Sequence, residues 1–177
     1  MLKTALKRVM EEYPGLFFGT NPVEVEAPFK MFVHRWGEFS SSCDENDGDE
    51  EEGKSLRLLR SILEPELKEV FVTLEDFRAA GMITFEHLWA IFVPGMFVFS
   101  RTDGADCLYR LGRTEVAFSD GREYLILHCG YVDYNGARFG TAAHVVALPQ
   151  SQDAVHFARL DAYPLDLHRI RRDLCEG

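Results

Sequence analysis

The dipeptide Asn135-Gly136 lies between two long runs of residues that favour β-strands. The run "REYLILHCGYVDY" (122–134) precedes it, and "ARFGTAAHVVAL" (137–148) follows it. Asparagine and glycine readily adopt the positive φ angles of a two-residue hairpin turn. The three segments together therefore predict a long antiparallel hairpin, and any fold for this chain must contain an antiparallel sheet.

A two-residue turn also predicts the register of this hairpin. The expected cross-strand pairs are Tyr134–Ala137, Asp133–Arg138, Val132–Phe139 and Tyr131–Gly140. In the same register His144 opposes Leu127, so His128 and His144 point to opposite faces of the sheet. That arrangement argues against a metal ion shared by the two imidazoles.

The remainder of the second half of the chain has the same strand-like residue pattern. Further β-branched and aromatic runs, separated by turn residues, are "MFVFS", "CLYRL", "TEVAF" and "VHFARL". We predict an antiparallel meander of five or six strands over residues 96–163. The tail "LDLHRIRRDL" predicts a helix over residues 166–175, with apolar residues on one side.

Helical periodicity dominates the first half of the chain. Residues 55–93 are expected to be helical, with Pro65 separating two helices because proline suits the first turn of a helix. The segment "APFKMFVHRWGEF" (27–39) is expected to be extended and partly buried. The predicted class is α+β, with helices first and sheet second, in a single domain spanning residues 1–177.

Acidic residues concentrate in one segment. Of the formal net charge of −10, seven negative charges fall within residues 44–52. We predict that residues 40–54 form an exposed, mobile acidic loop. No basic footprint for nucleic acid is evident. The chain has no apolar run of 18 residues and no secreted cysteine framework, so we expect an intracellular, cytoplasmic protein that binds neither nucleic acid nor membrane.

The acidic segment contains a match to the phosphate-loop pattern, "GDEEEGKS" (48–55). Its four variable positions are all acidic, Asp49 to Glu52. These carboxylates would repel a polyphosphate, and the preceding segment contains no strand. We therefore expect no nucleotide at this loop, no other cofactor and no metal site.

Two groups of residues are candidate sites. His34, Arg35 and Trp36 form a candidate partner-binding surface, because tryptophan and arginine are frequent in interface hot spots. The alternative is a small-molecule or hydrolytic pocket lined by Tyr124, His128 and Tyr131. No catalytic residue is predicted, because Cys129 and His128 are adjacent on a strand and point to opposite faces.

Four blocks in order resemble a known family: "PFKMFVHRWGEF", "ITFEHLWAIFVPG", "VDYNGARFG" and "YPLDLH". The chain resembles the domain of unknown function that precedes AAA-type ATPase modules in many proteins of filamentous fungi. The resemblance implies a non-catalytic recognition or regulatory domain. Its partner would be a protein or a downstream ATPase module, and this chain would be part of a longer ATPase or a truncated relative. A stand-alone scaffold that attracts basic partners through the acidic loop is the third hypothesis.

Overall fold

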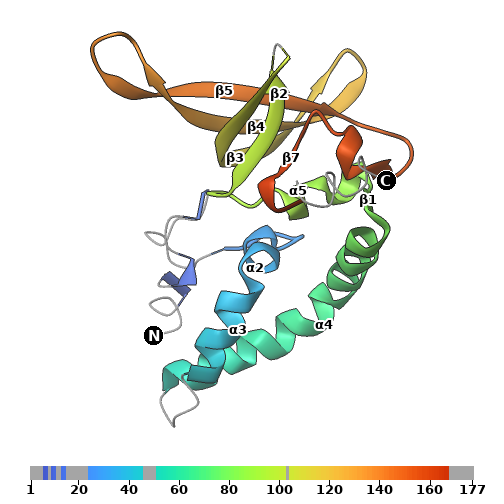
Figure 1. Cartoon of the computed structure of the whole chain (residues 1–177). Helices are drawn as coiled ribbons and strands as arrows, with labels where there is room; N and C mark the ends of the chain where they lie inside the picture. Colours follow the sequence, from blue (N-terminus) through green and yellow to red (C-terminus); the bar gives the residue numbers. More distant parts are fainter. Residues whose placement is uncertain are drawn as a thin grey trace. The chain divides into compact units, whose positions relative to one another are not determined.

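The computed structural model describes residues 6–7, 9–10, 13–14, 24–45, 51–102 and 104–167 (Figure 1). The chain divides into two compact units, Met1–Glu75 and Asp76–Gly177. The first contains helices and the second an antiparallel sheet, so the predicted α+β class is confirmed. Most of the predicted helix over 166–175 lies outside the described residues; its first described part belongs to a short 3-10 turn, η3 (Leu165–Leu167).

The first unit is built around two helices, α3 (Trp36–Glu45) and α4 (Glu51–Ala80), preceded by the short α2 (Lys30–His34). Arg60 on α4 forms an ion pair with Asp44 near the end of α3, at 2.8 Å. At the other end, the rings of Trp36 and Phe71 lie 5.4 Å apart. The two contacts show that α3 and α4 run antiparallel.

Two expectations for this region are wrong. Residues 30–34 and 36–45 are helical rather than extended. Residues 40–45 belong to α3 and residues 51–54 to α4, so neither is part of the predicted loop over 40–54; residues 46–50 lie outside the described residues. Phe39 and Cys43, one helical turn apart, are both buried. Burial of this apolar face outweighs the low helix propensity of the three intervening serines.

Pro65 does not divide α4, contrary to the prediction. Proline removes the hydrogen bond to the carbonyl of Ser61, four residues earlier. Both residues are exposed, so water can satisfy that carbonyl. The leucines on either side, Leu63 and Leu67, are buried and hold the helix in place across the interruption.

The second unit contains a five-stranded antiparallel sheet in the order β5-β4-β3-β2-β7. Its strands are β2 (Phe97–Thr102), β3 (Ala105–Ser119), β4 (Arg122–Tyr134), β5 (Phe139–Pro149) and β7 (Ala162–Pro164). The first four form a meander, and the short β7 returns to pair with β2 (Figure 1). The predicted antiparallel meander is confirmed.

One face of this sheet is buried. On β4 the buried residues alternate: Leu125, Leu127 and Cys129. Strand β3 was expected as two strands, but it is one strand with an irregularity between Leu111 and Arg113. This bulge adds one residue, Gly112, and so allows apolar residues on both sides of it to reach the same face.

Smaller elements complete the second unit. The segment "VHFARL" is not a strand of the main sheet, as had been expected. Val155–His156 (β6) pair with β1 (Met82–Ile83) in a separate two-stranded sheet, and Phe157–Arg159 form the 3-10 turn η2. Residues 55–93 were expected to be helical, but Met82–Ile83 form β1. The helical segment resumes as η1 (Phe85–His87) and α5 (Leu88–Ile91).

The hairpin between β4 and β5 forms at the expected place but in a different register. Tyr134 pairs with Phe139, and Asp133 pairs with Gly140 rather than with Arg138. The loop has four residues because the side-chain oxygen of Asn135 accepts hydrogen bonds from the N–H groups of Ala137 and Arg138, at 3.0 and 2.9 Å. This side-chain turn competes with the two-residue turn that Asn-Gly favours.

The register differs by two residues, so every side chain keeps its predicted face. His144 pairs with Cys129 instead of opposing Leu127. It therefore lies on the buried side of the sheet, whereas His128 lies on the outer side. The separation of the two imidazoles is confirmed even though the pairing behind it was wrong.

Candidate functional site

The residues predicted to bind a partner, His34, Arg35 and Trp36, contact other residues of the first unit. Tyr13 Oη lies 2.8 Å from His34 Nδ1, and the guanidinium of Arg35 donates to the Val9 carbonyl at 2.8 Å. Burial raises the pKa of the Tyr13 hydroxyl to about 12, so this phenol stays protonated at neutral pH. The three residues therefore help to hold the helical unit together.

The structure does not bring Tyr124, His128 and Tyr131 together. Tyr124 and His128 lie on the outer face of β4, and Tyr131 lies on the opposite face. The ring of Tyr131 instead packs edge-on against Tyr109, with ring centroids 5.7 Å apart. The expected pocket at these three side chains is absent.

His128 belongs to a small ionic cluster on the outer face of the sheet. Its Nε2 lies 2.9 Å from Oε1 of Glu115, while Arg113 donates to the other carboxylate oxygen of Glu115. Hydrogen bonds from Arg113 and then from His128 hold the pKa of the Glu115 carboxyl below its ordinary value. The cluster lies on the outer face of the sheet, where Arg113 pairs with His128 across β3 and β4.

This cluster gives a graded prediction for the titration of Glu115. A depressed pKa means that the carboxylate stays charged to lower pH than usual, and that the cluster is lost as the pH falls through the depressed value. Arg113→Ala is expected to raise the Glu115 pKa toward its ordinary value, and His128→Ala to raise it by less. Side-chain carboxyl NMR titration measures all three values. An equal or larger shift in His128→Ala would contradict the order of the two interactions.

Cys43 and Cys129 are poor nucleophiles. Burial raises the pKa of Cys129 to about 11 and also raises that of Cys43. A thiol with a raised pKa forms little thiolate at neutral pH. Within the described parts of the chain, no three His, Cys, Asp or Glu side chains are grouped as metal ligands would be.

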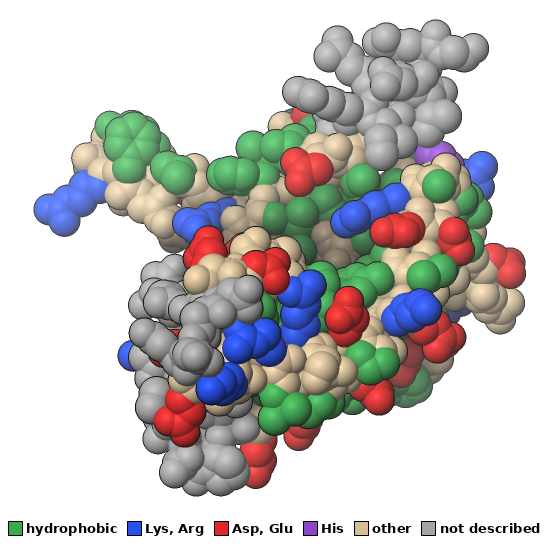
Figure 2. Space-filling model, turned by 90° about the horizontal axis from the view of Figure 1, so that it is seen from below, with side chains coloured by type: hydrophobic (Ala, Val, Ile, Leu, Met, Phe, Trp, Pro, Cys, Tyr) green, Lys and Arg blue, Asp and Glu red, His purple; other side chains and the backbone are tan. Residues whose placement is uncertain are grey.

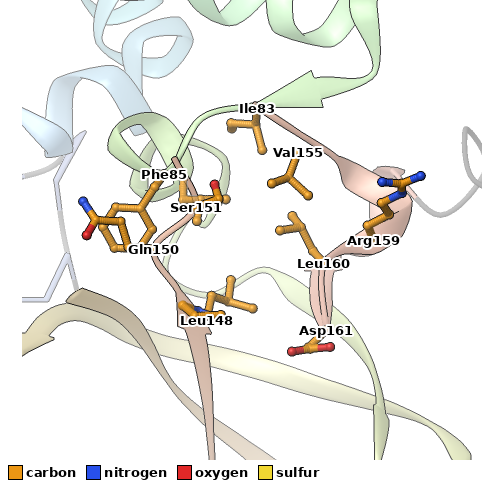
Figure 3. Close-up of a pocket in the computed structure, with 11 residues that line it drawn as sticks. Ile83, Phe85, Leu148, Gln150, Ser151, Val155, Arg159, Leu160 and Asp161 are labelled. Atoms are coloured by element: carbon orange, nitrogen blue, oxygen red, sulfur yellow. The ribbon is translucent and has the colours of Figure 1, made fainter. Parts of the chain in front are cut away.

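The second unit contains a small pocket of about 160 Å³ (Figure 3). Ile83, Val155 and Leu160 line its centre, with Gln150 and Arg159 toward its edges. Drug-sized ligands occupy pockets of roughly 300–1,000 Å³, so this one suits a single side chain or a small apolar group. No sequence pattern indicated it, because its lining comes from short segments far apart in the chain.

The strongest surface feature is the end of the β4–β5 hairpin. Pairing between β3 and β4 stops at Arg110–Gly130, whereas β4 and β5 remain paired as far as Tyr134–Phe139. Residues 131–142 therefore form a two-stranded ribbon that extends beyond β3 (Figure 1). Residues 131–141 are all exposed.

One face of this ribbon is apolar and open to solvent. Val132 is 75% exposed and Phe139 is 77% exposed, and Tyr134 lies between them with its ring centroid 4.8 Å from that of Phe139. All three side chains lie on the same face of the pair of strands. Figure 2 shows hydrophobic side chains with a basic neighbour at the end of this projecting arm. Contiguous exposed apolar side chains of this kind make the ribbon a candidate interaction site.

The base of the ribbon is fixed to the sheet. The imidazole of His144 stacks on the Tyr109 ring, with centroids 4.2 Å apart and an interplanar angle of 9°. Together with Tyr131, these rings hold the inner face where β4 and β5 leave β3. An isolated two-stranded hairpin is only marginally stable, so this aromatic group is what positions the exposed face.

The sequence contained one signal for this surface that had been interpreted differently. The segment "YVDYNGARFG" had a structural explanation as a register of four cross-strand pairs, and no site was assigned to it. What identifies the site is that Val132, Tyr134 and Phe139 lie on the outer face of the hairpin, beyond the last pair between β3 and β4. The bulge and strand lengths that decide this are not visible in the residue pattern.

Comparison with known proteins gives one match. Residues 73–169 match the model of a family described as a domain of unknown function, DUF7025. The match falls almost entirely in the second unit and contains the sheet, the pocket and the ribbon. No curated protein and no solved structure matches the chain significantly. Among the described residues, no helix combines the length and apolar character needed to span a bilayer.

Proposed function

Because the chain belongs to the DUF7025 family, whose description assigns no activity, we propose from its surface that it is a non-catalytic protein-recognition domain. The observation that carries this proposal is the apolar face of the β4–β5 ribbon, formed by Val132, Tyr134 and Phe139. Solvent-exposed aromatic residues that are held rigidly contribute strongly to protein interfaces. Burying them on a partner would release the hydration cost of their exposure.

The chemistry of the other surfaces supports binding over catalysis. The Glu115 cluster lies on the same outer face as the apolar side chains. Its carboxylate, imidazole and guanidinium groups could form the polar rim of an interface around them. Interfaces commonly combine an apolar centre with such a rim. A partner contact would then use the outer face of β4 from His128 to Tyr134.

The resemblance to fungal domains that precede AAA-type ATPase modules supports an AAA-type ATPase, its substrates or its adaptors as the partner class. Domains in that position hold substrates or adaptors for the ATPase or contact its module. We therefore propose that this chain serves an AAA-type ATPase, with the ribbon as its first contact surface. The helical-unit surface at His34, Arg35 and Trp36 stays a secondary proposal, because its side chains already have partners within their own unit.

The test compares matched surface variants for binding to a purified AAA-type ATPase module and to adaptor proteins captured with it. Val132→Ser combined with Phe139→Ser is expected to weaken binding by at least about tenfold, because hot-spot residues are lost. Phe118→Ser is the control, since Phe118 is 73% exposed but lies at the β3–β4 end, on the opposite face. Isothermal titration measures both affinities.

Three outcomes separate the surfaces. Loss of binding in the ribbon variant alone supports the proposal. Loss in Trp36→Ala alone would transfer the site to the helical unit. Equal binding by the ribbon variant and the wild type would contradict the ribbon as the contact surface, and circular dichroism verifies that each variant is folded.

A further inference from the structure

The free edge of β5 is an open site for another strand. β5 is the first strand in the order of the sheet and pairs only with β4 among the described strands. It runs without interruption for 11 residues, roughly 36 Å at about 3.3 Å per residue. A long edge strand presents a row of unpaired backbone groups that can pair with another chain.

The hydrogen bonds that flank the β4–β5 ladder show which backbone groups point outward. Asn135 N–H donates to the Arg138 carbonyl, and Gln150 N–H donates to the Glu123 carbonyl. Because hydrogen-bonded pairs alternate along an antiparallel ladder, the even-numbered residues of β5 bond to β4. The odd-numbered ones, including Thr141, Ala143 and Val145, direct their N–H and C=O groups to the open edge.

β5 lacks the devices that protect edge strands. It contains no Asp, Glu, Lys or Arg, in contrast to β2, β3 and β4, and its only proline, Pro149, is its last residue. Its register with β4 has no bulge. The opposite edge is protected, because β7 has three residues and ends in Pro164. Natural sheets use short length, charge, proline or bulges against edge pairing, and only β7 has such protection here.

We propose that β5 pairs with β5 of a second copy of this chain, antiparallel around a two-fold axis at His144. This register pairs the full length of the strand, since Phe139 and Pro149 are equally distant from His144. It places the outward odd-numbered backbone groups opposite each other, Ala143 with Val145 and Thr141 with Ala147. The result is a continuous ten-stranded sheet.

The side chains of β5 fit this register. Each small residue opposes a larger one: Gly140 with Leu148, Ala142 with Val146 and Ala143 with Val145. Cross-strand pairs on one face are the unit of sheet stabilisation, and such size matching fills the space between the strands. The pairing uses the backbone edge of β5 and leaves the outer face of β4 open. Phe139 belongs both to the proposed recognition surface and to this pairing, where it opposes Pro149.

The neutrality of β5 points to a second copy as the occupant. In this two-fold pair a charged side chain at residues 143–145, at or next to the axis, would be brought close to its own copy, and like charges across strands destabilise the pair. In a chain with 27% charged residues, an 11-residue edge strand without any is compatible with self-pairing. Two-fold dimers are also the commonest oligomers of soluble proteins.

The first test measures the mass in solution by sedimentation velocity over a concentration series. The wild-type chain is expected to form a dimer, and Ala143→Pro is expected to weaken the dimer at least tenfold, because proline removes an outward N–H group without removing a bond to β4. Ala143→Val is the matched control, since it keeps the N–H group. A monomeric wild type, including one that binds another protein's strand at this edge, would overturn the proposal.

The second test reports the register. In a Cys129→Ala background, His144→Cys places two thiols opposite each other at the axis. Oxidised glutathione, which is itself reduced to two thiols, is expected to join them as an intermolecular disulfide. Ala142→Cys is the control, because residue 142 would oppose 146 and not its own copy. Equal cross-linking of both variants, or none at 144, would overturn this register; peptide mass spectrometry identifies the joined residues.

Discussion

Replacing Phe92 with alanine is expected to lower the free energy of unfolding by about 3–5 kcal/mol. Phe92 follows α5 in the second unit and is 0% exposed. Truncation removes the transfer free energy of the ring and leaves a cavity that close-packed neighbours fill only in part. The cost is large because domains of this size have only about 5–15 kcal/mol of stability in total.

Denaturant unfolding monitored by circular dichroism measures this loss, and Phe118→Ala is the matched control. Both substitutions remove the same atoms, but the Phe118 side chain is 73% exposed. The control is expected to change stability by less than about 0.5 kcal/mol, as is usual for surface positions. Similar losses in the two variants would show that Phe92 does not pack in the core of its unit.

The second large effect is expected at Gly81, the residue that ends α4. Its φ angle is +67°, and a Cβ atom there would lie 3.1 Å from Nε2 of His156. Gly81→Val is expected to lower the free energy of unfolding by about 2–3 kcal/mol, because a β-branched residue is strained in the left-handed region. The crowding against the imidazole adds to the strain.

Gly81→Asn separates the backbone effect from the crowding. Asparagine tolerates the left-handed conformation better than other side chains but carries the same Cβ atom. It is expected to destabilise the chain by clearly less than valine. Thermal unfolding measures the loss of stability in each variant. Equal losses in the two variants would show that the contact with His156 outweighs the backbone conformation.

The sequence predicted the sheet well because its pattern is local and repeated. The β-branched and aromatic runs and the turn residues between them were sufficient to identify the meander, and the alternation along β4 and β5 placed His128 and His144 on opposite faces. The register of the β4–β5 hairpin was not predictable in the same way. It depends on the side-chain oxygen of Asn135 accepting hydrogen bonds from two backbone N–H groups, an alternative that asparagine offers in turns.

The helical half was harder to predict, for two physical reasons. The acidic segment suggested a loop by composition, but Glu51 and Glu52 are in the first turn of α4, where carboxylates interact favourably with the helix dipole. Around Phe39, tertiary burial selected a helix although serines favour other conformations. The first of these effects is local to α4, whereas the second depends on burial against residues distant in sequence.

The candidate site was missed because it depends on the relative lengths of strands. Val132 and Phe139 look like ordinary strand residues. They are exposed because they lie on the outer face of the sheet, in the part of the hairpin that extends beyond the last β3–β4 pair. The predicted residues His34, Arg35 and Trp36 had the right chemical types for an interface. Residue type alone could not reveal that Tyr13 contacts His34 and that Phe71 contacts Trp36 within the same unit.

The four-residue loop of the β4–β5 hairpin constrains how relatives of this chain can differ in length. Inserting or deleting two residues at its tip preserves which side chains of β5 are buried, as the difference between the expected and observed registers illustrates. A single-residue change that shifts the pairing by one would turn Val146 and Leu148 outward and Val145 inward. Length variation at this tip should therefore occur in even steps unless a bulge absorbs the odd residue.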